Sequence, residues 1–294
     1  MELSKKMQGR IQKVLEEYED PELGFMARSL VQTTLPHRDV GKVNQYSRES
    51  GNITLTVQPA ITVKDGKEIN YGIPYGSIPR LVLTWLSTEV VKTKNQKVEL
   101  GDSLSSFMRE LDLLVTGGKW GSIPRLKKQV ERLFRSRFML SVRHNQGVSE
   151  KDFVLAQERH FFWDVVNPDQ ESLFKSSIVI SSGFYEELIT KPVPIDLRVI
   201  KLLKQSPLAI DLYAWLTYRN SYLQKETLIS WEKLALQFGS NYKEIRIFKL
   251  KVGNTLKKLL HLYPARTTIR DDGLMIYPSP TSIASKNKGS FQQF

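Results

Sequence analysis

Two stretches of the chain, residues 117–143 and 241–270, place apolar side chains at helical intervals between polar ones. The first contains Leu126, Val130, Leu133 and Phe134, which follow the i, i+4, i+7, i+8 spacing of a helix face that packs on a core. The second contains the corresponding set Ile245, Phe248, Val252, Leu256 and Leu259. The pattern predicts an amphipathic helix in each stretch.

A second pair of helices is predicted upstream of these two. Their apolar positions are related by a constant shift of 130 residues, from Ile78, Val82, Trp85 and Leu86 to Leu208, Leu212, Trp215 and Leu216. Each helix begins at a serine suited to cap it, Ser77 or Ser206, with a proline in its first turn. Because tryptophan is a rare residue, the repetition predicts a duplicated domain.

The order of elements after each tryptophan also agrees between the two copies. A short extended segment comes first, Lys97–Leu100 or Glu226–Ser230, and a short amphipathic helix follows it. The short helices are built on Leu104, Phe107 and Leu111 and on Trp231, Leu234 and Phe238. A turn then leads into the basic helix. Helix, turn and second helix is the order of a DNA-binding helix-turn-helix.

A β-hairpin is predicted after each basic helix. In the second copy Thr267–Arg270 and Leu274–Tyr277 flank an Asp-Gly pair, a strong hairpin signal. In the first copy Phe138–Arg143 and a run that ends near Trp163 flank a longer loop around 145–147. A hairpin that follows a recognition helix is a wing. The expected fold is therefore α+β, with two tandem winged-helix domains in pseudo-repeat.

The best domain boundary is the segment 191–194, because Pro192 and Pro194 favour an extended connection. A strand-like run, Ile178–Ile180, precedes it, and Asp196 is placed to cap a helix after it. We expect an N-terminal helix or arm over 1–50, a first winged-helix domain over 51–190, a second over 191–280, and a polar tail over 281–294.

Two smaller expectations concern the N-terminal part. The runs Ile53–Val57 and Ile61–Lys67 are expected to pair as a hairpin that extends the first sheet. A short helix near the N-terminus is expected to dock on the body through Ile11, Val14, Leu15 and Tyr18.

The distribution of charge along the chain indicates the kind of partner. The 294 residues contain 43 Lys and Arg against 31 Asp and Glu, a net charge of +12. Each basic window, 117–143 and 241–270, carries eight cations and one anion, so the rest of the chain is slightly acidic. Solvated helix faces usually mix signs, so two such windows favour contact with a polyanion, and double-stranded DNA suits a helix-turn-helix best.

The candidate DNA-binding residues are the cations on these helices and hairpins. Arg143 and Arg266 are expected on the wings, and Arg125, Arg132 and Arg246 are the candidates for contact with guanine edges. The full set is Lys119, Arg125, Lys128, Arg132, Arg135, Arg143, Lys243, Arg246, Lys249, Arg266 and Arg270. Trp120, at the start of the first basic helix, is expected to pack under the turn, with stacking on a base as the alternative.

An enzymatic function finds little support. Cysteine is absent, which excludes thiol catalysis and cysteine-ligated metals, and His37, His144, His160 and His261 lack metal-ligand spacing. A phosphate-binding glycine loop is absent as well. We expect no catalytic residue, metal or cofactor. Without a signal peptide or an apolar membrane-spanning run, the protein is expected in the cytoplasm without membrane contact.

Several longer runs resemble a known family. They are 75–81 (YGSIPRL), 100–104 (LGDSL) with Phe107-Met108, 192–196 (PVPID), 206–211 (SPLAID) and 215–219 (WLTYR). These runs resemble the plasmid-encoded RepA-type replication initiators of bacteria. The resemblance implies two tandem winged-helix domains that bind directly repeated origin sites, or iterons, open the adjacent DNA, and recruit the host initiator and helicase. Many such proteins also repress their own promoter as dimers, which leaves a homodimer open.

Two functions therefore compete, a plasmid replication initiator and a transcriptional repressor that binds a palindromic operator as a dimer. A simple repressor needs one recognition helix per subunit. Two different recognition helices in one chain allow a monomer to grip one asymmetric site, with the helices about 10 bp apart and the site covering roughly 20 bp. Directly repeated sites would separate the two functions.

Overall fold

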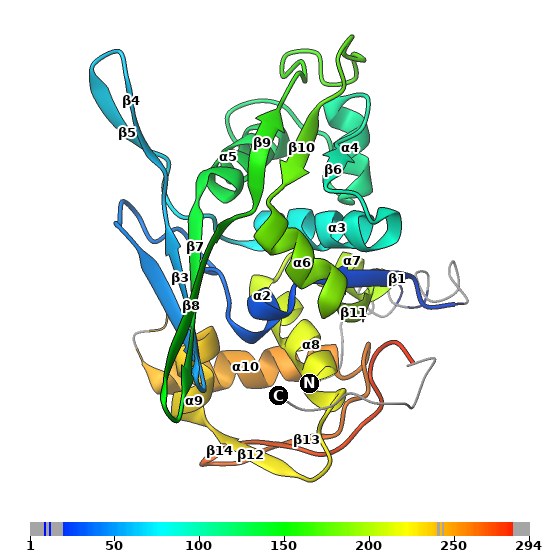
Figure 1. Cartoon of the computed structure of the whole chain (residues 1–294). Helices are drawn as coiled ribbons and strands as arrows, with labels where there is room; N and C mark the ends of the chain where they lie inside the picture. The colour runs from blue at the N-terminus through cyan, green and yellow to red at the C-terminus, as the bar shows by residue number, and fades with distance from the viewer. Residues whose placement is uncertain (1–8, 10–11, 13–19, 240–241, 243, 285–294) are drawn as a thin grey trace.

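The structure is a computed structural model that describes residues 20–239, 242 and 244–284, with residues 9 and 12 before them. The expected N-terminal docking helix, most of the polar tail and Lys243 lie outside the described residues. Helices and strands are both plentiful, which agrees with a mixed α and β fold (Figure 1).

The first half follows the predicted order of elements. It consists of α3 (Ser77–Thr93), β6 (Lys97–Glu99), α4 (Leu104–Glu110), α5 (Ser122–Arg135), β9 (Ala156–His160) and β10 (Ser177–Ile180). The three strands form one antiparallel sheet in the order β6-β10-β9.

The second half repeats this order. It consists of α8 (Pro207–Asn220), β12 (Thr227–Ser230), α9 (Trp231–Phe238), α10 (Ile245–Leu259), β13 (Thr267–Ile269) and β14 (Gly273–Ile276). The strand order is β12-β14-β13, so in each of the two sheets the strand that comes last in sequence lies in the centre. Elements and strand order thus correspond one to one in the two halves.

One insertion distinguishes the first half. Strands β7 (Arg137–His144) and β8 (Gly147–Val154) form a hairpin after α5 and join β2 (Tyr46–Ser50) and β3 (Ile53–Gln58) in the order β2-β3-β7-β8. The expected pairing of Phe138–Arg143 with a run near Trp163 is therefore wrong. A two-residue turn after His144 closes the hairpin at once, and β3, far back in the chain, provides the other neighbour.

The expected hairpin of Ile53–Val57 with Ile61–Lys67 is wrong for a similar reason. Instead β4 (Ile61–Lys64) pairs with β5 (Lys67–Asn70) across Asp65 and Gly66, both of which have positive φ. An Asp-Gly pair readily adopts this turn, which matches the twist of a tight hairpin. The β4-β5 hairpin projects from the body at the upper left of Figure 1.

The remaining elements connect the two halves. They are β1 (Leu23–Met26), α2 (Arg28–Gln32), α6 (Ser182–Thr190), β11 (Val193–Asp196) and α7 (Leu197–Leu203). The proline segment is extended, as predicted, but it is a strand paired with β1. Asp196 caps α7 by accepting a hydrogen bond from the Arg198 N–H, which confirms that expectation.

The two predicted serine caps differ in outcome. Ser206 caps α8 by accepting from the Ala209 N–H, with Pro207 in the first turn. Ser77, by contrast, is already the first helical residue of α3, and Gly76 with φ of 80° occupies the cap position. The capping role expected for Ser77 is therefore wrong, because this glycine makes the turn into the helix one residue earlier.

Apolar side chains divide into two large buried clusters, one for each half. Leu86, Phe107 and Phe134 belong to the first cluster, and Trp215 and Phe248 belong to the second. Trp85, expected in the core, is only half-buried, and its indole donates to Glu110. Residues 23–50 contribute to both clusters, so this segment packs on the body. The domain boundaries given above stay a prediction.

A buried ion pair links the two halves. Arg80 of α3 donates to both carboxylate oxygens of Asp211 on α8, at 2.6 and 2.7 Å, and to the carbonyls of Leu35 and Gly76. The His37 ring lies 2.9 Å from the same carboxylate. All three side chains are almost fully buried.

Candidate nucleic-acid interface

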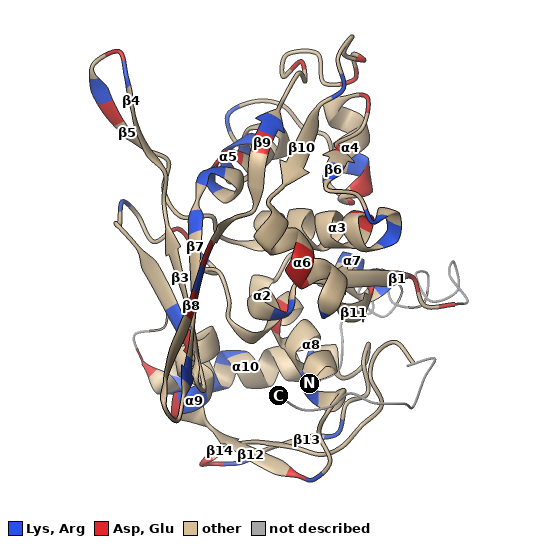
Figure 2. Cartoon of the chain, viewed as in Figure 1, with Lys and Arg blue, Asp and Glu red and all other residues tan. Residues whose placement is uncertain are grey.

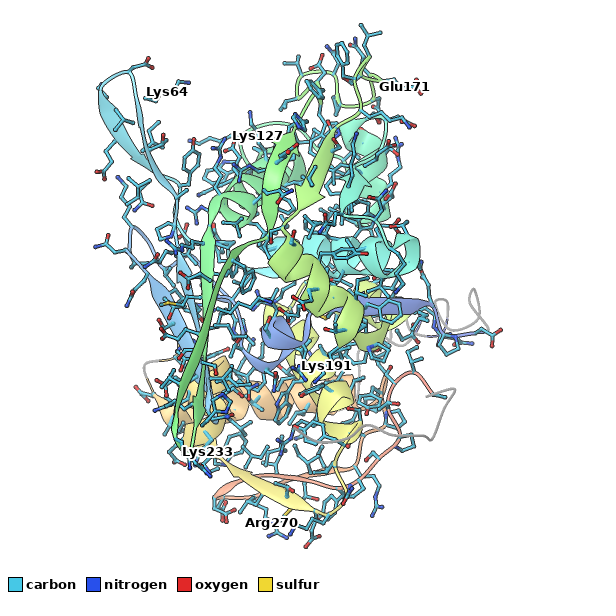
Figure 3. The ribbon with its side chains drawn as sticks, viewed as in Figure 1. Lys64, Lys127, Glu171, Lys191, Lys233 and Arg270 are labelled. Carbon is cyan, nitrogen blue, oxygen red and sulfur yellow. The ribbon has the colours of Figure 1, made fainter. Side chains whose placement is uncertain are left out.

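Helix α5 has a buried apolar face, as expected, and an exposed basic face that differs from the prediction at one position. Leu126, Val130, Leu133 and Phe134 are buried against the first core. The opposite side is solvated and basic, with Arg125, Lys127, Lys128 and Arg135 all exposed. Lys127 is labelled on α5 in Figure 3, and Figure 2 shows the basic residues of this helix in blue.

Arg132 does not belong to this exposed set. Its guanidinium donates to the Ile73 carbonyl at 3.0 Å, pairs with Asp39 at 3.2 Å and lies over the Tyr75 ring. Partial burial acts to raise the pKa of Asp39, but hydrogen bonds from Arg132 and from the Gly41 N–H outweigh it and lower the pKa. The structure thus gives Arg132 an internal role, away from the face that the sequence pattern assigned to it.

The ends of α5 carry aromatic side chains beside cations. Arg135 lies over the Tyr71 ring at 4.6 Å, at the base of the β4-β5 hairpin. At the other end Lys119 lies over the Trp120 ring at 5.2 Å, and Trp120 is 84% exposed. The expected packing of Trp120 under the turn is therefore wrong. The turn instead closes through hydrogen bonds between Thr116 and Ser122, which leave the indole outside.

Helix α10 departs further from its predicted pattern. Phe248, Val252, Leu256 and Leu259 are buried, as expected. Ile245, expected on the same face, is 42% exposed, because the core begins only one turn into the helix. The exposed side is a mixture of aliphatic, cationic and amide side chains, made up of Arg246, Ile247, Leu250, Lys251, Asn254, Lys257 and Lys258. Sequence reasoning missed the exposed Ile247 and Leu250, since it assigned apolar residues to the core.

Lys249 has an internal partner. Its ammonium donates to the Asp271 carbonyl at 3.1 Å and lies over the Trp231 ring. These contacts tie α10 to the β13-β14 turn and to the start of α9. The remaining predicted cation of this helix that the structure describes, Arg246, is exposed at its first turn.

The hairpins present the predicted wing cations in two different settings. Arg266, directly before β13, and Arg270, in the turn after it, are exposed, and Arg270 is labelled at the lower end of Figure 3. Arg143 is exposed as well, but it lies near the tip of β7-β8 and within 3.5 Å of Glu49. The hairpin that corresponds to β13-β14 in strand order is β9-β10, so Arg143 does not lie on the equivalent hairpin.

The long loop between β9 and β10 has the opposite chemistry. Residues 161–176 contain three acids against Lys175, and they expose Phe162, Leu173 and Phe174. Glu171 of this loop is labelled at the top of Figure 3, at the far end of the view from Arg270. An acidic tip does not suit contact with phosphate.

Among the residues that the structure describes, His, Asp and Glu side chains nowhere gather in groups of three or more that could hold a metal ion. In the same part of the chain, every helix is too short or too polar to cross a membrane. The candidate nucleic-acid interface consists of α5 and α10, with the β13-β14 hairpin beside α10.

Comparison with known proteins identifies the class. The model of the family described as plasmid encoded RepA protein matches residues 73–233, from the loop before α3 to the start of α9. Because this match covers more than half of the chain, the protein belongs to the plasmid-encoded RepA family, as its sequence resemblance indicated.

Solved structures agree at the level of the fold. Crystals of selenomethionine derivatives of domains 2 and 3 of RctB give a TM-score of 0.51 at 14% identity, covering 86% of this chain and 96% of that one. A second structure of RctB domains 2-3 gives 0.50, also at 14% identity, over 85% and 95%. No curated protein sequence matches the chain.

Proposed function

We propose that this protein is a plasmid replication initiator that binds double-stranded DNA sequence-specifically. In this proposal each half is a winged-helix domain, α5 and α10 are the recognition helices, and β13-β14 is the wing of the second half. The observation that carries the proposal is the pair of basic helices, each held on its own core at the same place in a repeated order of elements. Membership in the RepA family supports it independently.

Two unlike recognition helices favour an asymmetric site. If α5 and α10 enter successive major grooves on one side of the duplex, their centres lie about 10 bp apart and the site covers roughly 20 bp. The buried pair between Arg80 and Asp211 supports this arrangement, because it fixes the halves relative to each other. Successive molecules would then occupy directly repeated sites at the origin.

The rest of the proposal follows from the family. Binding to the repeats promotes opening of the adjacent DNA and recruits the host initiator and helicase, and a homodimer serves autoregulation. The protein acts in the bacterial cytoplasm as a binding protein and not as an enzyme. Incubation of the purified protein with supercoiled origin DNA and Mg²⁺ should therefore leave the DNA without nicks.

Footprinting of the purified protein on the DNA that neighbours its gene tests the function. We expect tandem protected repeats about 20 bp long, all in one orientation. A single protected palindrome over a promoter would favour the repressor instead. Absence of any sequence-specific protection would overturn both functions.

A further inference from the structure

One stripe of α10 combines exposed aliphatic side chains with an exposed amide. Ile247 is 47% exposed and Leu250 is 67% exposed. Asn254 is exposed too. The three positions follow i, i+3, i+7, so they lie along one side of the helix. This side is opposite Phe248 and Val252, which bind α10 to its core.

The stripe is bordered by cations. Arg246, Lys251, Lys257 and Lys258 are all exposed, and α10 itself contains no acid, although the exposed Glu244 precedes it as its N-cap. A basic rim around an apolar stripe complements a polyanion that also offers apolar groups. Duplex DNA has this chemistry, because its major groove is lined by phosphates and displays the C5 methyl of each thymine.

The stripe is held in a fixed orientation. The Lys249 ammonium bonds the Asp271 carbonyl of the hairpin turn. A Cβ built at Gly253 would lie 3.3 Å from the Ile269 side chain, so the glycine lets β13 pack closely on the helix. Because these contacts restrain rotation of α10, the same three side chains face outward in every molecule.

We infer that Ile247, Leu250 and Asn254 read A·T base pairs in the major groove. The aliphatic pair contacts thymine methyl groups, and the amide forms a bidentate pair with N6 and N7 of adenine. The inference deepens the proposed function and rests on it. It also assigns the two helices different tasks, since α5 exposes cations without an aliphatic partner on its solvated face.

Thymine methyl groups can be deleted one at a time, which allows a direct test. The full-length protein is first used to select tight duplexes from a random-sequence pool. Each thymine of the selected duplex is then replaced singly by deoxyuridine, which lacks only the methyl group. We expect about fourfold weaker binding at one or more positions, the loss that corresponds to one buried methyl-sized group.

The variant Leu250→Ala links this loss to the side chain. Wild-type protein should distinguish thymine from uracil at these positions, whereas Leu250→Ala should bind both duplexes equally at the position that Leu250 contacts and keep the distinction at any position that Ile247 contacts. Leu173→Ala, a change at a 98% exposed leucine in the acidic loop, is the matched control and should retain the distinction. Lys251→Ala should weaken both duplexes by the same factor. Circular dichroism checks that each variant is folded.

The possible results of this experiment distinguish failure of the inference from failure of the proposed function. Selection of a specific duplex that binds equally well after every uracil substitution overturns the inference and leaves the proposed function intact. A selected site without A·T pairs does the same. If no duplex is selected at all, the proposed function fails, and the inference fails with it. The uracil series uses wild-type protein, so it decides the matter even if a variant does not fold.

Discussion

Helices α5 and α10 hold the same place in their two halves, yet their solvated faces differ. On α5 the apolar positions pack on the core, and the fully exposed positions are all cations, with the partly exposed Glu131 among them. On α10 the outer face retains Ile247 and Leu250 among its cations. Cations reach phosphates of any sequence, whereas aliphatic side chains distinguish bases in the groove. Two helices in equivalent places thus share their packing while their exposed positions differ in chemistry.

The two helices can act together only if the halves keep a fixed relation, and Arg80 with Asp211 provides it. Asp211→Ala leaves Arg80 buried without its carboxylate, so the free energy of unfolding should fall by about 3–5 kcal/mol. Urea denaturation measures the change. Asp169→Ala, which breaks an exposed pair with Arg109, is the control and should cost about 0–1 kcal/mol. Equal effects from the two variants would contradict the coupling role.

Charge reversal tests whether both helices reach the DNA. Arg125→Glu on α5 and Arg246→Glu on α10 should each weaken binding to the selected duplex by about tenfold or more at physiological salt, because a phosphate contact becomes a repulsion. Fluorescence anisotropy measures the affinity, and its salt dependence should become shallower.

The matched control for these variants is Lys92→Glu, which changes the net charge equally at an exposed position near the end of α3. It should alter affinity about twofold at most, because screening removes distant charges. Unchanged binding by Arg125→Glu would show that this part of α5 does not contact the DNA, and the comparison of α5 with α10 as two DNA-binding helices would then fail. Unchanged binding by Arg246→Glu would do the same for α10.

The junction between the halves should also weaken in acid. Burial lowers the pKa of His37, although its hydrogen bond to Asp211 acts in the opposite direction. A lowered pKa means that the unfolded chain binds the proton more readily, so stability rises with pH up to about 6.5 and falls as the pH drops below it. Unfolding midpoints in urea should be lower at pH 5.5 than at pH 7.5. The variant His37→Gln should reduce this difference.

The sequence predicted which helix positions are buried, because residue spacing determines them. It missed the contacts that depend on residues far away in the chain. Leu126 and Val252 are buried because helical spacing alone places them on a core face. Arg132 turns inward because Asp39, 93 residues away, accepts its hydrogen bond, and local spacing contains no record of that partner. The pairing of the β7-β8 hairpin with β3 was missed for the same reason, because β3 lies far back in the chain. Leu250 was missed because an apolar residue in a helix is counted toward the core unless the fold shows which side is covered.

The smallest expected change in affinity concerns Trp120, which reports whether the start of α5 contacts the DNA. Trp215 and Trp231 are buried, and Trp85 and Trp163 are half-buried, so Trp120 should dominate quenching of the intrinsic fluorescence by acrylamide. If the first turn of α5 lies on the duplex, DNA should protect this indole and lower the quenching constant. Trp120→Phe should abolish the change while weakening affinity only about twofold, since the indole adds stacking to an interface held mainly by charge. If DNA leaves the quenching constant unchanged, the start of α5 lies away from the groove. In that case α10 alone would enter the major groove.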